Sequence, residues 1–207
     1  MRLLSLAALL LVASAVMAVE EAAYETVEDF GDFELRRYAP LIHAEVEVDA
    51  TFERAGNQAF PILAGYIGGR NRSAEEVAMT APVTQTSAGE RIAMTAPVNQ
   101  TPASGDSGRY VVSFVMPAKY TLDTLPRPTD PRIRLRAEDG RLVAARRYSG
   151  RWTRARYAKE EERLMQAVAA AGLEVTGPPV YARYNPPWMP WFLRRNEVLV
   201  EVAAGSR

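Results

Sequence analysis

Apolar and polar positions alternate in two rhythms along this chain. In and directly after the strand expected at residues 41–48, the apolar residues Ala44, Val46 and Val48 alternate with the acidic Glu45, Glu47 and Asp49, which predicts one buried face and one polar face. His43 falls on the polar face in this register. Residues 34–38 also have strand character and are separated from residues 41–48 by Ala39-Pro40.

Two stretches follow a helical rhythm instead. Apolar residues recur at helical spacing from Phe52 to Tyr66, after Thr51 as a plausible N-cap and before a stop at Gly68-Gly69. Pro61 lies inside this stretch, where proline interrupts a helix unless packing compensates. A second helix is predicted after the cap residue Thr153, ending at Gly172.

Further strands complete the pattern. We expect residues 132–137 and 141–149 to form a hairpin around Asp139-Gly140, a favoured turn pair. Strands are also predicted at residues 109–116, 180–184 and 197–202. The order predicts an α+β fold of two similar halves of about ninety residues, each with a helix on its outer face.

One heptapeptide occurs twice, at residues 77–83 and 92–98, with the pattern Val/Ile-Ala-Met-Thr-Ala-Pro-Val. The segment between the copies is turn-like and contains Gly89. We interpret the two copies as extended segments that form a hairpin. Pro82 and Pro97 cannot donate to a ladder and must lie at an edge, an end or a bulge.

The first eighteen residues differ from the rest of the chain. Arg2 precedes an apolar run at residues 3–16, and small residues lead to Ala18. This is typical of a secretory signal peptide cleaved after Ala18, with residues 19–207 as a single domain. The predicted location is periplasmic or secreted, without stable membrane insertion. The alternative is a membrane tether formed by an uncleaved N-terminal segment.

Composition narrows the chemistry. The 207 residues contain 25 basic and 25 acidic side chains. The chain therefore lacks the excess of basic residues that is typical of nucleic-acid-binding proteins. Cysteine is absent, which excludes disulfides, thiolate ligands and cysteine nucleophiles. His43 is the only histidine, and no nucleophile–base pair is evident. We therefore predict a protein that is not an enzyme.

Several motifs together resemble the SOUL haem-binding protein family, most closely its short bacterial members. The matching segments cover roughly residues 24–202. They are Phe-Glu-Leu-Arg-Arg-Tyr-Ala-Pro at 33–40, Ala-Gly-Tyr-Ile-Gly-Gly-Arg-Asn at 64–71, both Ala-Met-Thr-Ala-Pro-Val copies, Phe-Val-Met-Pro at 114–117, Tyr-Ser-Gly at 148–150, the segment at 180–187 and Arg-Asn-Glu-Val at 195–198.

The resemblance implies a pseudo-twofold repeated, distorted β-barrel of twisted antiparallel sheets flanked by two α-helices. It also implies that a tetrapyrrole such as haem binds non-covalently between the first helix and the loop before the last strand. Arg194 and Arg195 would meet the propionates, although Arg195 could instead be an intramolecular ion-pair partner. The apolar candidate residues are Phe60, Leu63, Ile67, Trp188, Met189, Trp191 and Phe192.

Axial ligation of iron finds little support in this sequence. The position that family members are thought to give to a histidine holds Arg37, which stays protonated and cannot ligate iron. His43, six residues later, is the one candidate metal ligand, and its other interpretation is a partly exposed strand histidine. If haem binds, we expect a weak axial protein ligand or none.

The predicted function is therefore an exported haem carrier, buffer or scavenger with an apolar groove. The alternative is a general binding module for amphipathic small molecules without a specific haem role. The sequence does not indicate an oligomeric state.

Overall fold

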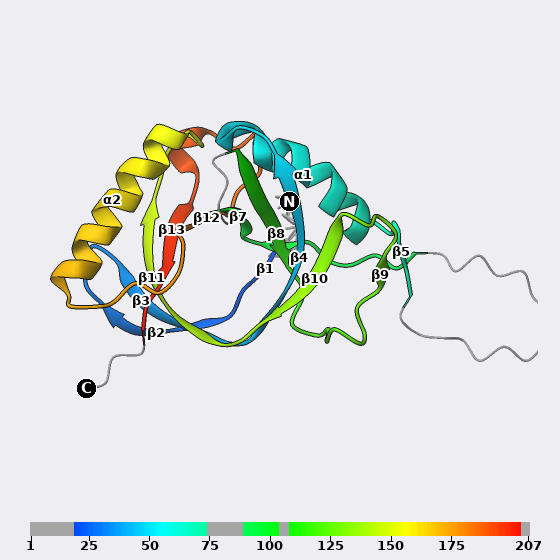
Figure 1. Cartoon of the computed structure of the whole chain (residues 1–207), viewed down its shortest axis with the longest axis horizontal. Coiled ribbons are helices and arrows are strands. Elements are labelled where there is room, and N and C mark those ends of the chain that lie inside the picture. The colour runs from blue at the N-terminus through cyan, green and yellow to red at the C-terminus, as the bar shows by residue number, and fades with distance from the viewer. Residues whose placement is uncertain (1–18, 74–88, 104–107, 204–207) are drawn as a thin grey trace, which may run out of the picture.

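A computed structural model describes residues 19–73, 89–103 and 108–203 of the chain. The predicted signal peptide and the first heptapeptide copy lie outside these residues. Two α-helices lie over one face of a curled sheet, as Figure 1 shows. The elements are β1 (Glu20–Glu21), β2 (Tyr24–Asp29), β3 (Glu34–Tyr38), β4 (Leu41–Asp49), α1 (Phe52–Ile67), β5 (Asn71–Arg72), β6 (Thr95–Ala96), β7 (Val98–Pro102), β8 (Arg109–Val115), β9 (Arg127–Pro128), β10 (Ile133–Glu138), β11 (Arg141–Tyr148), α2 (Arg154–Ala170), β12 (Val180–Arg183), the 3₁₀ turn η1 (Trp191–Leu193) and β13 (Asn196–Glu201).

The main sheet has nine antiparallel strands in the order β10-β4-β8-β7-β12-β13-β11-β3-β2. Apart from the additional edge strand β2, four strands lie on each side of the junction between β7 and β12. The first half places α1 against β4 and β8, and the second places α2 against β11 and β13. This arrangement confirms the predicted α+β fold with twisted sheets and two flanking helices.

The predicted hairpin of β10 and β11 is wrong. β10 pairs with β4 and β11 pairs with β3, so the chain crosses from one half to the other at Asp139-Gly140. β3 and β4 cross in the opposite direction, and Tyr38 faces Arg141 while Leu41 faces Glu138. A Cβ at Gly140 would lie 3.0 Å from the Tyr38 carbonyl oxygen. Glycine therefore permits this close crossing, rather than a tight hairpin.

Both predicted helices are present with nearly the expected bounds. α1 runs without interruption through Pro61, with a buried side formed by Phe52, Ala55, Ala59 and Leu63 against the sheet. The Thr153 hydroxyl accepts a hydrogen bond from the Arg156 backbone nitrogen, as expected for the cap of α2. None of the described helices is long and apolar enough to cross a membrane.

The second heptapeptide copy is extended, as predicted. Its threonine and following alanine form β6, which pairs in parallel with β1, and its final valine begins β7. The Thr95 hydroxyl donates to the backbone oxygen of Val115 and ties the copy to β8. Whether the two copies pair with one another stays a prediction, because the first lies outside the described residues.

Candidate functional site

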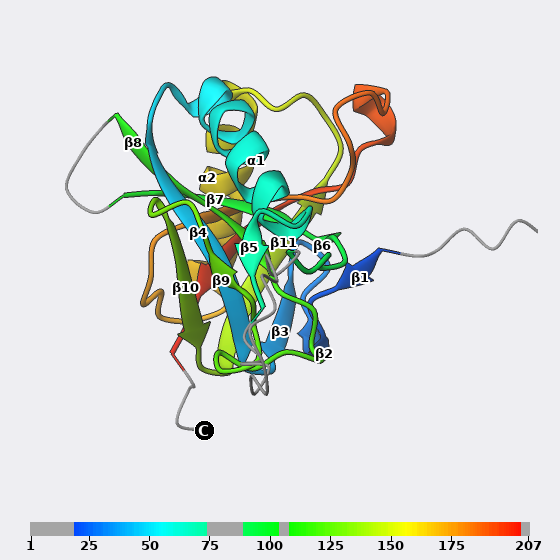
Figure 2. The ribbon, with the colours of Figure 1, turned by 90° about the vertical axis from the view of Figure 1, so that its right-hand side faces the viewer.

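The most exposed apolar side chains cluster in the connection between β12 and β13. We call residues 186–194, which include η1, the aromatic loop. Trp188 is 82% exposed, Phe192 is 58% exposed and Trp191 is 48% exposed. The loop projects from the body of the molecule at the upper right of Figure 2. Such a group of exposed aromatic residues is typical of a binding surface.

The aromatic loop is held in shape by its own backbone and by one arginine. The Arg194 guanidinium donates from Nε to the Met189 carbonyl oxygen at 2.8 Å and from an Nη to that of Pro187 at 2.5 Å. The Met189 nitrogen also donates to the Pro186 carbonyl oxygen. Arg194 is therefore a positioning residue for the loop. The loop offers its aromatic side chains to solvent on a preformed support.

Three arginines surround the tryptophans at the base of the loop. The guanidinium carbon lies 4.2 Å from the centre of the Trp152 ring for Arg194 and 5.1 Å for Arg183, while that of Arg151 lies 5.5 Å from the Trp191 ring. We call these five residues the arginine–tryptophan cluster. Within the described chain, none of the three arginines forms an ion pair with a carboxylate. Arg151 is the exposed member of the three, so its guanidinium can be reached by an anionic ligand.

Arg183 is the unusual member of this cluster because it is 8% exposed. One Nη donates to the Gln100 side-chain oxygen at 2.8 Å, while Nε has no hydrogen-bond partner among the described residues. A buried cation without a counter-ion is costly unless something compensates for its charge. Sequence reasoning missed Arg151, Trp152 and Arg183, although Arg183 lies in a segment that carries the family resemblance.

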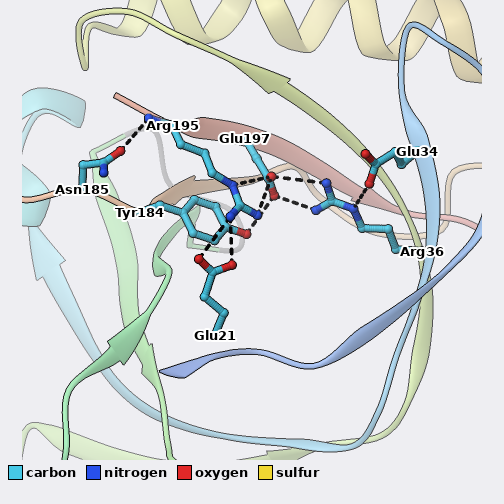
Figure 3. A network of polar contacts seen from close by, with 7 residues as sticks. All are labelled: Glu21, Glu34, Arg36, Tyr184, Asn185, Arg195 and Glu197. Atoms are coloured by element: carbon cyan, nitrogen blue, oxygen red, sulfur yellow. Dashed lines mark hydrogen bonds and ion pairs between the residues drawn. The ribbon is translucent and has the colours of Figure 1, made fainter. Parts of the chain in front are cut away.

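Arg195, by contrast, is fully engaged inside the protein (Figure 3). It bonds to Glu197 at 3.0 Å and to Glu21 at 2.8 Å, and it stacks over the Tyr184 ring at 3.7 Å. Glu197 in turn receives the Arg36 guanidinium at 2.7 Å. The structure therefore shows Arg195 as an intramolecular ion-pair partner, the alternative that the sequence left open. Arg194, not Arg195, lies beside the exposed aromatic residues.

The three candidate residues on α1 are not brought together with the aromatic loop. Leu63 is completely buried and Ile67 is 8% exposed, so both belong to the core. Phe60 is 40% exposed, and the centre of its ring lies 5.5 Å from the centre of the Phe114 ring. Figure 2 shows α1 well separated from the loop. A ligand-binding role for the α1 residues stays a prediction, and only Phe60 is exposed enough to meet a ligand without rearrangement.

Leu63 and Phe60 form a matched pair for measuring this difference. We expect Leu63→Ala to lower the free energy of unfolding by about 2–5 kcal/mol, because it opens a cavity in the core. Phe60→Ala should cost clearly less, since its ring is partly in solvent already. Urea unfolding of both variants measures the difference, and equal losses would contradict this assignment of Leu63 to the core.

His43 is not the partly exposed histidine that its position on the polar face predicted. It is 2% exposed in the interior of the sheet, where β4 lies between β10 and β8, and its Nε2 lies 3.2 Å from a carboxylate oxygen of Glu138. Among the described residues, no three side chains of the metal-binding types gather into a site. Because His43 is buried and its Nε2 already contacts Glu138, Nε2 is not accessible to the iron of a bound haem.

Comparison with known families is decisive at this point. The model of the SOUL heme-binding protein family matches residues 19–90 and 84–201, nearly all of the chain after residue 18. The chain belongs to the SOUL heme-binding protein family. The resemblance noted from the sequence is thus confirmed. A search of curated proteins found no match.

Solved structures with the same fold are distant in sequence. The C-terminal domain of EcmrR superposes with a TM-score of 0.58 at 10% identity, covering 87% of this chain and 98% of that one. A hydrolase from Listeria innocua gives 0.51 at 11% identity, covering 90% and 94%. An uncharacterized conserved protein from the same organism gives 0.51 at 11%, covering 81% and 91%. These likenesses show the fold alone.

Proposed function

We propose that this SOUL-family protein is an exported, non-enzymatic tetrapyrrole carrier, buffer or scavenger that binds haem at the aromatic loop. The observation that carries the proposal is the exposed loop beside three arginines that form no ion pair with a carboxylate among the described residues. The export step rests on residues 1–18, which have the composition of a signal peptide.

The chemistry of haem matches the two parts of this site. The macrocycle is a flat apolar surface that would lie against Trp188, Trp191 and Phe192. Its propionates are carboxylates, for which guanidinium groups are strong hydrogen-bonding partners. Arg151 and Arg183 would supply positive charge beside the macrocycle, while Arg194 keeps the loop in shape. Membership of a haem-binding family supports the same ligand.

Retention would depend on apolar contact and charge rather than on an iron ligand. Imidazole and thiolate are the common axial donors, the chain has no cysteine, and His43 is buried against Glu138. Such binding releases its ligand easily, which suits a carrier or buffer. A weak axial ligand or none therefore remains the expectation for the bound iron.

A comparison of hemin with its dimethyl ester, two ligands that differ in charge, tests the proposal. We expect hemin to bind saturably and at least fivefold more tightly than its dimethyl ester, because the ester lacks the propionate charges that the arginines would meet. Arg151→Gln should narrow this difference. Equal binding of hemin and its ester would contradict the role of the arginines. Titration of both ligands by absorbance and tryptophan quenching provides the measurement.

Adding unrelated planar compounds to this titration distinguishes the haem carrier from the second candidate, a general binding module for amphipathic molecules. The exposed aromatic loop alone would accept many planar apolar compounds. If unrelated planar hydrophobic compounds bind as tightly as hemin does, the general module is the better description. A clear preference for hemin supports the specific one.

A further inference from the structure

A cleft of about 460 Å³ lies at the corner where β3 passes into β4 and β10 passes into β11. We call it the corner cleft. It is bounded by β1 and residues 22–23 on one side and by residues 115–118 and 120–122 on the other. None of the aromatic-loop residues lines it. The cleft is therefore separate from the proposed tetrapyrrole site.

The walls of the corner cleft are mainly apolar, and its charged groups are all acidic. Leu41, Ile42, Val115, Met116 and Leu122 provide aliphatic and thioether surface. Its four charged side chains are Glu20, Glu21, Glu138 and Asp139, and no lysine, arginine or histidine lines it. Charge of one sign within an apolar cleft favours ligands of the opposite sign.

Two of these carboxylates already have arginine partners. Glu21 bonds to Arg195 at 2.8 Å, and Glu138 bonds to Arg141 at 3.1 Å and to Arg136 at 3.2 Å, with His43 also 3.2 Å away. Burial alone would raise the pKa of Glu138, but these neighbours outweigh it and hold the pKa at about 2. Glu138 is thus ionised at neutral pH.

The other two carboxylates, Glu20 and Asp139, have no ion-pair partner among the described residues. The Ala118 backbone nitrogen donates to Glu20 at 2.8 Å, which holds this carboxylate in place at the wall of the cleft. Lys119 lies between the lining residues Ala118 and Tyr120, and its ammonium is 4.7 Å from the centre of the Tyr120 ring. Tyr120 lines the cleft, so a ring that already attracts one cation forms part of its wall.

We propose that the corner cleft is a second binding site, specific for amphipathic organic cations such as quaternary ammonium compounds with an aromatic ring. The ring system would lie against the apolar walls, and the cationic group would lie near Glu20 and Asp139. The volume falls within the range of small-molecule sites, about 300–1,000 Å³. Anionic ligands, including the propionates of a tetrapyrrole, are disfavoured by Glu20 and Asp139, the two carboxylates without an ion-pair partner among the described residues.

A set of naphthalene probes that differ in charge tests this directly. We expect trimethyl(1-naphthylmethyl)ammonium to bind saturably, and 2-naphthalenesulfonate to bind at least tenfold more weakly. The affinities are measured by isothermal titration calorimetry with the whole protein. Equal binding of the cation and the anion, or no binding of the cation at millimolar concentration, would overturn the proposal.

Two variants locate the binding in the cleft. Glu20→Gln/Asp139→Asn should weaken binding of the cation at least fivefold, while Glu25→Gln/Glu162→Gln changes the net charge equally on exposed surface elsewhere and should not. Ala118→Trp fills the cleft without altering its charges and should also weaken binding. Retained binding in Ala118→Trp would place the cation elsewhere and overturn the assignment.

The experiment is independent of the proposed haem function. The Glu20→Gln/Asp139→Asn variant should bind hemin as the unaltered protein does, because it leaves the aromatic loop intact. Undiminished binding of the cation in this variant would overturn the electrostatic part of the proposal. Displacement of hemin by the naphthylmethyl cation would contradict the separation of the two sites.

Discussion

Replacing Glu197 by alanine is expected to lower the free energy of unfolding by about 3–5 kcal/mol, because it leaves a buried arginine without its partner. Glu197 is completely buried, and Arg36 is 1% exposed. The two side chains form a double hydrogen bond with distances of 2.7 and 3.3 Å. Urea unfolding monitored by circular dichroism measures the loss.

The rest of the network explains why the loss should be large. Glu197 also accepts hydrogen bonds from the Tyr184 hydroxyl at 2.8 Å and from Arg195 at 3.1 Å (Figure 3). Burial would raise the pKa of Glu197, but the hydrogen bond and charge of Arg36, together with Arg195, hold that pKa below its usual value. The carboxylate is therefore ionised, and its removal leaves two cations without this partner.

Glu34→Ala is the matched control. Glu34 bonds to the same guanidinium at 2.7 Å, but its side chain is 39% exposed. Exposed ion pairs contribute at most about 1 kcal/mol, so this variant should stay close to the unaltered protein. A loss below 1 kcal/mol for Glu197→Ala, or equal losses in the two variants, would contradict a central role for the buried pair.

The same network gives a physical meaning to the Arg-Asn-Glu-Val motif. Arg195 and Glu197 belong to the ion-pair network, while Asn196 accepts a hydrogen bond from the Trp152 indole at 2.7 Å and donates to the Gly150 backbone oxygen. The motif thus anchors the end of the aromatic loop and one ring of the arginine–tryptophan cluster. The contacts that the structure shows for this motif are intramolecular ones that support the loop.

The second large effect concerns ligand binding. Trp188→Ser/Phe192→Ser is expected to weaken hemin binding at least tenfold, because it removes the two most exposed aromatic side chains of the loop. Aromatic residues dominate the binding energy of most interfaces, and a tenfold loss corresponds to about 1.4 kcal/mol. Hemin titration of the variant measures this change.

Stability should not change in this variant, since both side chains are mostly in solvent. Met165→Ser is a suitable control, because Met165 is an exposed apolar residue on α2, 40% exposed and outside the loop. Its hemin affinity should match that of the unaltered protein. A tenfold loss in the control as well would indicate nonspecific adsorption to exposed apolar surface.

Local patterns predicted the elements of this fold well, and pairing between distant segments poorly. The start of α1 after Thr51 and the bounds of β3 were predicted from the spacing and type of residues, although the Thr51 side chain makes no capping hydrogen bond. The pairing of β10 with β4 does not, because Asp139-Gly140 has the sequence of a hairpin turn but serves as a crossing point. A turn signal carries no information about which strand will cover the other edge.

Burial of charged residues was the other limit. Glu160 has the sequence context of a solvated helix face, but it is 1% exposed and bonded to Arg146, Arg156 and Arg163. Arg156 and Arg163 lie on α2 itself, but Arg146 comes from β11. His43 likewise meets Glu138 of the neighbouring strand β10. Alternation along one strand or helix could not reveal these partners from other elements.

For the candidate site, the sequence identified the aromatic loop but not its surroundings. Trp188, Trp191 and Phe192 were recognisable as a proline-stiffened aromatic run. Arg151 and Trp152 come from the segment before α2, and Arg183 comes from β12, so only the folded chain brings them to the loop. The α1 candidates do not lie at the loop. Apolar residues at helical spacing are found on a face that packs in the core as well as on a face that binds a ligand, so the spacing could not distinguish the two.

The measurement that tests the central claim most directly is a Soret titration of the purified protein with hemin, with Trp188→Ser/Phe192→Ser alongside. The account predicts a saturable shift at micromolar protein and a midpoint at least tenfold higher in the variant. No saturable shift with the unaltered protein, or the same midpoint in both proteins, would contradict haem binding at the aromatic loop.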